Sequence, residues 1–261
     1  MIVESSYVLA GAVTGFVVGM TGVGGGALMT PILLLLFGIA PATAIATDLW
    51  FAAITKVAAV AVHHRAGQVD WQVARRLWLG SLPVALAVVV VVAMGATVQR
   101  LGWLTQVIAW VVALTAAGLL FGPWLVRRLH TRDLQPSPCF MRVQGPLTVV
   151  AGGFLGLIVA LTSVGAGALG SILLLALYPQ RLPPHRLVAT DLLHAIPLAV
   201  VAGLGYLVAG MVDGALLLNL LLGSIPAAIA GSYAARFSPP GWLRTALALV
   251  LAATAVKLLM V

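Results

Sequence analysis

The chain has 261 residues, of which 62% are hydrophobic and only 8% are charged, and its formal net charge is +8. This composition excludes a soluble domain with an ordinary charged surface and predicts a polytopic all-α membrane protein. The basic residues lie at the ends of the expected helices, where membrane topology is a sufficient reason for them, so the charge does not indicate nucleic-acid binding. A single cysteine, Cys139, excludes an internal disulfide, and no spacing of residues predicts a metal site.

The expected elements follow the chain in two similar series. The start, MIVESSYV, has no Lys or Arg and does not resemble a secretory signal, so we expect the first helix to be retained. The first series is an arm over 7–20, a glycine-rich break, a second arm to 37, and helices over 43–62, 71–94 and 101–126. A polar linker over 127–144 follows. The second series has arms over 146–161 and 167–177, then helices over 187–208, 211–236 and 241–260.

The glycine-rich break is the most unusual stretch of the first series. Residues 19–31 read GMTGVGGGALMTP and lie inside a charge-free run from 5 to 47, which is too long for one crossing of about 20 residues. The glycines therefore interrupt a helix at membrane depth. Non-helical backbone cannot face lipid, so the break must lie against protein or line a water-filled cavity. The sequence predicts a site, or the wall of a site, at this place.

The same pattern recurs in the second half. Residues 161–171 read LTSVGAGALGS, and an offset of 141 places them on the first break; an offset of 143 then places Ala-Thr-Asp at 46–48 on 189–191 and Gly-Ser-x-Pro at 80–83 on 223–226. From 46 to 88, 18 of 43 positions are identical to their partners. The chain is thus predicted to be an internal duplication, with a first repeat over 1–126, a basic linker over 127–144 and a second repeat over 145–261.

The arginines and lysines bear on whether the two repeats are parallel or inverted. If each broken segment is one crossing, the repeats are parallel and the basic residues other than Lys56 divide 8 to 5 between the two sides of the membrane. If the two arms go in and return, as re-entrant hairpins or short crossings, the repeats are inverted and the division is 11 to 2. The positive-inside rule favours the inverted arrangement, with the linker in the cytoplasm and the N-terminus on the outer side.

Two roles are open for the glycines. Gly11, Gly15 and Gly19, spaced by four, suit close helix packing. The clustered glycines open the second arms, so free N–H groups and the positive end of a helix dipole would face the break and favour an anion. The predicted substrate-binding residues are Thr21, Gly22, Gly24, Gly25, Gly26, Thr47, Thr162, Ser163, Gly165, Ala166, Gly167 and Thr190.

These two breaks, the repeated Ala-Thr-Asp and the repeated Gly-Ser-x-Pro resemble the sulfite exporter TauE/SafE family, a family of membrane anion transporters. The resemblance covers nearly the whole chain. It implies transport of sulfite, thiosulfate or small organic sulfonates across the bacterial inner membrane without a cofactor. The second break has Ser163 and Ala166 where the first has Gly22 and Gly25, so the two sides of the site need not be equivalent.

Four ionisable residues in apolar helices need an explanation, because charges at membrane depth are costly. Asp48 and Asp191 occupy equivalent positions and are expected to accept hydrogen bonds or to carry protons. Lys56, whose counterpart is Ala199, would either balance a bound anion or pair with Asp48. His194 lies one turn after Asp191 and is either a proton-exchanging group or a buried structural histidine. Beside the aspartates, Thr47 and Thr190 would either donate to an oxyanion or bond to the preceding turn.

The sequence therefore predicts a secondary transporter that exports a small sulfur oxyanion, held at the midplane between the two breaks, by alternating access. The alternatives are a proton-coupled uptake permease for thiosulfate or sulfonates and a non-transport membrane factor in sulfur metabolism. No catalytic residues are predicted, because the sequence contains neither HExxH nor GxSxG and its cysteine is isolated. The expected partners are the lipid bilayer and the anion; a homodimer stays open.

Overall fold

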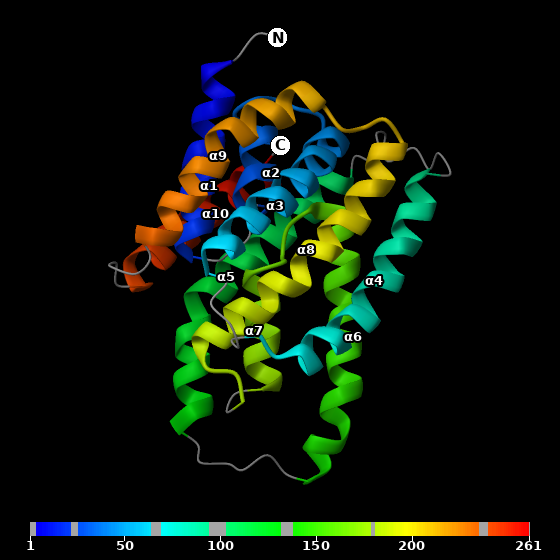
Figure 1. Ribbon diagram of the computed structural model, residues 1–261, viewed down its shortest axis with the longest axis vertical. Helices are drawn as coiled ribbons and strands as arrows, with labels where there is room; N and C mark the ends of the chain where they lie inside the picture. Colours follow the sequence, from blue (N-terminus) through cyan, green and yellow to red (C-terminus); the bar gives the residue numbers. More distant parts are fainter. Residues whose placement is uncertain are drawn as a thin grey trace.

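The computed structural model of the protein describes residues 4–21, 26–63, 69–93, 103–131, 138–178, 181–234 and 240–260. Within these ranges the chain forms ten α-helices and no strand (Figure 1). The helices are α1 (Ser5–Thr21), α2 (Gly26–Leu35), α3 (Pro41–His63), α4 (Trp71–Ala93), α5 (Trp103–Thr131), α6 (Pro138–Thr162), α7 (Ala168–Leu177), α8 (Pro184–Val208), α9 (Gly214–Ala234) and α10 (Pro240–Leu259).

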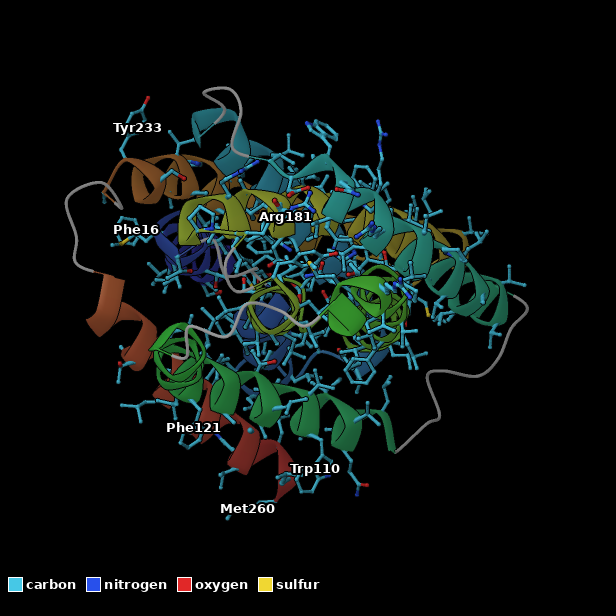
Figure 2. All side chains as sticks on the ribbon, turned by 90° about the horizontal axis from the view of Figure 1, so that it is seen from below. Phe16, Trp110, Phe121, Arg181, Tyr233 and Met260 are labelled. Atoms are coloured by element: carbon cyan, nitrogen blue, oxygen red, sulfur yellow. The ribbon has the colours of Figure 1, made fainter. Side chains whose placement is uncertain are left out.

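The helices have the length and hydropathy of membrane spans. Among the described residues, five stretches are long and apolar enough to cross a bilayer: Trp71–Val92, Leu104–Gly122, Met141–Thr162, Arg186–Val208 and Gly214–Ala234. Large apolar side chains point outward around the bundle; Figure 2 shows Phe16, Trp110, Phe121 and Met260 at its rim. A surface of this kind fits contact with lipid and confirms a multi-pass membrane protein.

The two arms of the first half form a hairpin. The ring of Tyr7, near the start of α1, packs on the ring of Phe37, just after the end of α2, with centroids 4.6 Å apart. The start of α1 and the end of α2 therefore lie together, so the chain direction reverses between the two helices. Helix α2 has only 10 residues, which corresponds to about 15 Å at 1.5 Å per residue.

The two halves exchange their glycine-rich helices. Gly11, Gly15 and Gly19 of α1 lie directly against the backbone of α9 at Leu220, Ser224 and Ala228. Both series of numbers rise together, so α1 and α9 run in the same direction. This contact confirms the prediction that these three glycines serve close packing, because a Cβ at any of them would collide with main-chain atoms.

The equivalent contact joins α4 and α6. Gly152 and Gly156 of α6 lie against Leu77 and Ser81 of α4, and each of these four residues is the repeat partner of one in the α1–α9 contact. Both helix pairs lie side by side in Figure 1, α1 with α9 at the upper left and α4 with α6 at the lower right.

Two hydrogen bonds repeat the same exchange at the helix starts. The amide of Asp70, before α4, donates to Thr190 Oγ1 of α8 at 3.0 Å. The amide of Asp213, before α9, donates to Thr47 Oγ1 of α3 at 3.3 Å. Residues 70 and 213, and 47 and 190, are partners at the offset of 143. In each case a threonine of one half therefore accepts a hydrogen bond from the residue that precedes a helix of the other half.

The segment over 127–144, expected to be a polar linker, is helical at both of its ends. Helix α5 continues to Thr131 and α6 begins at Pro138, where proline suits the first turn because its missing N–H would have no partner there. As a result α6 has 25 residues, longer than the short arm that the glycine pattern predicted. Figure 1 places the start of α1 at one end of the molecule and the end of α5 and the start of α6 at the other.

Candidate functional site

The second break is a compact, fully buried turn between α6 and α7. Its backbone has positive φ angles at Ser163 (58°), Gly165 (110°) and Gly167 (128°), and all residues from 163 to 167 are buried. Glycine suits two of these positions because it has no Cβ to clash there. Gly167 precedes α7 and gives that helix no side-chain cap.

Three amides of this turn have no hydrogen-bond acceptor among the described residues. The N–H groups of Gly165, Ala166 and Gly167 donate no hydrogen bond to a described residue, whereas Val164 N donates to Thr162 Oγ1 at 3.1 Å. Thr162 thus holds the turn in shape, and it also donates to Ile158 O at 2.7 Å. Successive free amides at a helix N-terminus form an anion-binding concavity.

The first break meets the second. Its predicted residues Gly22, Gly24 and Gly25 lie outside the described residues, and Thr21, the last residue of α1, donates to Val17 O at 2.7 Å. Gly26 begins α2 and lies so close to the carbonyl of Ser163 that a Cβ at Gly26 could not be accommodated. The described edges of the two breaks are therefore in direct contact.

A buried aspartate stands beside each break. Thr30 Oγ1 of α2 donates to Asp48 Oδ2, and Ser171 Oγ of α7 donates to Asp191 Oδ2 at 3.2 Å. Thr30 and Ser171 are partners at the offset of 141, so both carboxylates are held in the same way. Asp191 also packs against the backbone of Gly170.

Lys56 joins the two halves at this place. It is only 2% exposed, and its Nζ donates to Ala166 O of the second break at 3.3 Å. Both buried carboxylates, Asp191 and Asp48, are within electrostatic range of its ammonium group. Within the described part of the chain it forms no direct ion pair with either of them. One ammonium group therefore offsets part of the negative charge of two carboxylates.

Several buried polar atoms around this cluster have no hydrogen-bond partner among the described residues. They include Asp48 Oδ1, Asp191 Oδ1, Ser163 Oγ and His194 Nδ1. A buried polar group without a partner costs about 1–3 kcal/mol, so four such atoms around one lysine indicate a place where a ligand or water binds. Ser163 lies beside Asp48 without a hydrogen bond of normal geometry between them.

The other predicted residues are engaged in contacts of the fold. Thr47 and Thr190 accept the amide hydrogen bonds that join the halves, and Thr190 also donates to Arg186 O at 2.7 Å. His194 Nε2 shares a hydrogen bond with Ser81 Oγ at 2.9 Å. Its carbonyl accepts from Trp78 Nε1 at 3.3 Å.

Sequence reasoning missed the hydroxyl groups that hold the aspartates. Thr30 and Ser171 stand four residues after the last glycine of each break and share the offset of the repeat, which was the signal that could have identified them. It also missed the ion pair between Arg181 and Asp70, at 2.7 Å, because those residues are 111 positions apart.

The family model for the sulfite exporter TauE/SafE matches residues 7–258 of the chain. The chain belongs to the sulfite exporter TauE/SafE family. It is 37% identical over 237 residues to the probable membrane transporter protein YjnA of Bacillus subtilis (strain 168), a match that covers 90% of this chain and 91% of that protein. No solved structure matches the chain significantly. As a TauE/SafE member, the chain is a membrane transporter, and the cluster around Lys56 is its candidate substrate site.

Proposed function

We propose that this chain exports a small sulfur oxyanion, sulfite or an organosulfonate, across the bacterial inner membrane by secondary transport. The observation that carries the proposal is the contact between the two breaks at Gly26 and Ser163, with the ammonium group of Lys56 beside them. The anion would accept hydrogen bonds from the free amides of the second break and from Ser163 Oγ, and Lys56 would supply the opposite charge.

The repeats are proposed to be inverted. Tyr7 on Phe37 supports a first pair of arms that goes in and returns, so α3 would run with α1 and α4 against it. Helix α9, the repeat partner of α4, runs with α1. An element of the first half and its partner in the second half would then point in opposite directions, which favours alternating access around a central site.

The orientation follows from the arginines. With inverted repeats, 11 basic residues face one side and 2 face the other, so we place the α5–α6 connection in the cytoplasm and the N-terminus outside. Export then has a ready driving force, because each negative charge that leaves a cell with a negative interior gains about 2.3 kcal/mol per 100 mV.

A second candidate, proton-coupled uptake of thiosulfate or sulfonates, is favoured by one observation. Two buried carboxylates, Asp48 and Asp191, face a single cation, and a carboxylate inside a membrane protein is a usual proton carrier. A non-transport role in sulfur metabolism is the weakest candidate. We propose no enzymatic activity.

The test is flux through purified protein in liposomes loaded with labelled sulfite, thiosulfate or isethionate. Gly167→Val places a β-branched side chain at φ 128° and should abolish flux, because this backbone conformation is strained for any residue with a Cβ and the turn that presents the amides must change shape. Gly214→Val is the matched control, since a Cβ there meets nothing within 4 Å, and it should transport like the wild type.

Both variants must first elute as single species and keep their helical circular dichroism. Equal flux from folded Gly167→Val and wild type would show that the second break is not part of the substrate site. Absence of exchange of all three anions by folded wild-type protein would contradict the proposed function.

A further inference from the structure

The buried cluster has more negative than positive groups. Asp48 is fully buried, and Asp191 and Lys56 are each only 2% exposed. With all three ionised, the cluster carries one uncompensated negative charge. A bound anion would add to it in a water-poor environment, where an unpaired charge costs several kcal/mol. Two carboxylates that share a site cannot readily both stay ionised beside a further anion.

The geometry distinguishes the two aspartates. Lys56 Nζ bonds to Ala166 O, directly before α7, and Asp191 packs on Gly170 of the same helix. The ammonium group of Lys56 is thus held toward the α7 side of the cluster, where Asp191 lies. Asp48, a residue of α3, lies instead against α2, where Thr30 donates to its Oδ2. Asp48 is therefore the carboxylate that Lys56 compensates less.

Asp48 lies beside Ser163, a residue of the second break to which the proposed anion would bind. Its Oδ1 has no hydrogen-bond partner among the described residues, and the same is true of Ser163 Oγ beside it. As a carboxylate, Oδ1 would repel an oxyanion. As a carboxylic acid, it becomes a hydrogen-bond donor.

We propose that Asp48 takes up one proton from water when the anion binds, and that its Oδ1–H then donates a hydrogen bond to the anion next to Ser163. This inference rests on the proposed function and adds a proton-carrying substrate ligand to it. The proton and the anion travel together in the same direction. A dianion still moves one net negative charge, so the membrane potential continues to drive its export, whereas a monoanion moves none.

Apart from Lys56 and Asp48 itself, the charged or titratable side chains at this place that the structure describes come from α8. They are Asp191 and His194, and His194 is also within electrostatic range of Lys56. Helices α2 and α9 contribute hydroxyl groups, such as Thr30 and Ser224, the latter 2.9 Å from Thr55 Oγ1. Helices α1, α2 and α9 contain no charged side chain. Asp191 and His194 are thus the alternatives that the experiment must separate from Asp48.

The first measurement is equilibrium binding of ³⁵S-thiosulfate to purified protein between pH 6 and pH 8, a range in which thiosulfate itself does not titrate. One linked proton changes affinity by up to about tenfold per pH unit, with tighter binding at the lower pH. We expect the wild type to show this dependence. Asp48→Asn keeps a donor at this position but cannot take up a proton, so its affinity should be independent of pH.

The second measurement is proton movement during thiosulfate flux in liposomes that contain a pH-sensitive dye. One proton should accompany each thiosulfate in the wild type and none in Asp48→Asn. If Asp48→Asn does not fold, infrared difference spectra of the wild type should still show a new protonated carboxyl band when thiosulfate binds.

Each other outcome is decisive. Thiosulfate binding and exchange without pH dependence or proton movement would overturn the inference and leave the proposed function intact. If the affinity for thiosulfate still depends on pH in Asp48→Asn but no longer does so in Asp191→Asn or His194→Gln, the proton binds to one of those residues and not to Asp48. Failure of folded wild-type protein to exchange thiosulfate, sulfite or isethionate would remove the proposed function and this inference with it.

Discussion

The guanidinium group of Arg181 holds the carboxylate of Asp70 through two hydrogen bonds, Nε to Oδ2 at 2.7 Å and Nη2 to Oδ1 at 3.0 Å. Arg181 lies in the connection between α7 and α8, and Asp70 directly precedes α4, so the pair joins the two halves. Seen from below in Figure 2, Arg181 lies near the middle of the outline, whereas Phe16 and Trp110 lie at its rim. Asp213, the partner of Asp70 in the repeat, instead accepts from the amides of Ala215 and Leu216. This ionic contact is therefore asymmetric.

We predict that Arg181→Ala makes the second break easier to reach from the side of the molecule on which Arg181 lies. The arginine side chain is 43% exposed but Asp70 is only 6% exposed, so leaving this buried carboxylate without its two hydrogen bonds should cost about 1.5–3 kcal/mol of stability. In a Cys139→Ser background, a cysteine placed at position 163 should react several-fold faster with a water-soluble sulfonate-bearing thiol reagent when Arg181 is removed.

The control is Arg142→Ala, which removes an exposed arginine of α6 that forms no ion pair with a described residue. Its labelling rate should equal that of the parent. Equal labelling rates in Arg181→Ala and Arg142→Ala would show that the ion pair does not limit access.

A second prediction concerns the hydroxyl group that holds Asp48. Thr30→Val keeps the shape of the side chain but removes the donor to a buried carboxylate, which should cost about 1.5–3 kcal/mol of unfolding free energy. Thr30→Ser keeps the hydroxyl and should cost much less. Thermal unfolding in detergent compares the two variants, and equal losses of stability would mean that packing of the methyl group, not the hydrogen bond, matters at Thr30.

A third prediction tests whether Lys56 compensates Asp191. Lys56→Met leaves a buried carboxylate without its cation and should destabilise the protein by about 3–5 kcal/mol. Adding Asp191→Asn should recover much of that loss, because the remaining charge has gone. Adding Asp48→Asn instead should recover less, since Lys56 bonds to Ala166 O directly before α7, the helix on which Asp191 packs.

Unfolding of the single and double variants in denaturant gives the coupling energies. Lys56→Met and the two double variants that contain it should bind sulfite or thiosulfate poorly, whatever their stability, because the positive charge at the anion site is absent. Restored anion binding in Lys56→Met with Asp191→Asn would assign Lys56 a purely structural role.

A fourth prediction uses two adjacent glycines of α6. Gly152 lies against the backbone of Leu77, so Gly152→Ala forces α4 and α6 apart and should cost about 1–3 kcal/mol or more. A Cβ at Gly153 would meet Val84 Cγ2 at 3.6 Å, which is an ordinary contact, so Gly153→Ala should be tolerated. Melting temperatures in detergent decide the matter, and equal values would contradict the close packing of α4 and α6.

The sequence predicted those parts of the molecule that depend on local pattern. Glycines spaced by four located the α1 packing surface, and the break at 163–167 was found from its composition. The order of helices followed from alternating apolar runs and breakers. The α5–α6 connection was wrong in extent, because its polar residues suggested a linker although nothing before Pro136 prevents a helix.

The parts that depend on distant pairing could not be predicted. Nothing local to α1 says that its partner is α9 rather than α2, and nothing local to Lys56 says that it reaches Ala166 rather than Asp48, eight positions earlier. These choices depend on how the two halves interlock. The repeat offset did contain part of the answer, because Thr30 and Ser171 could have been paired with the aspartates that they hold.

The exchange of helices between the halves also sets an order of assembly. Gly152 meets Leu77 across 75 positions, whereas Gly11 meets Leu220 across 209. At a synthesis rate of about 5–20 residues per second, α1 waits roughly 10–40 s for its partner, while α6 finds α4 already made. Two contacts that are equivalent in the finished protein therefore form at very different times. A nascent chain that stops before α9 leaves the glycine face of α1 uncovered, where quality-control proteases of the membrane can recognise it.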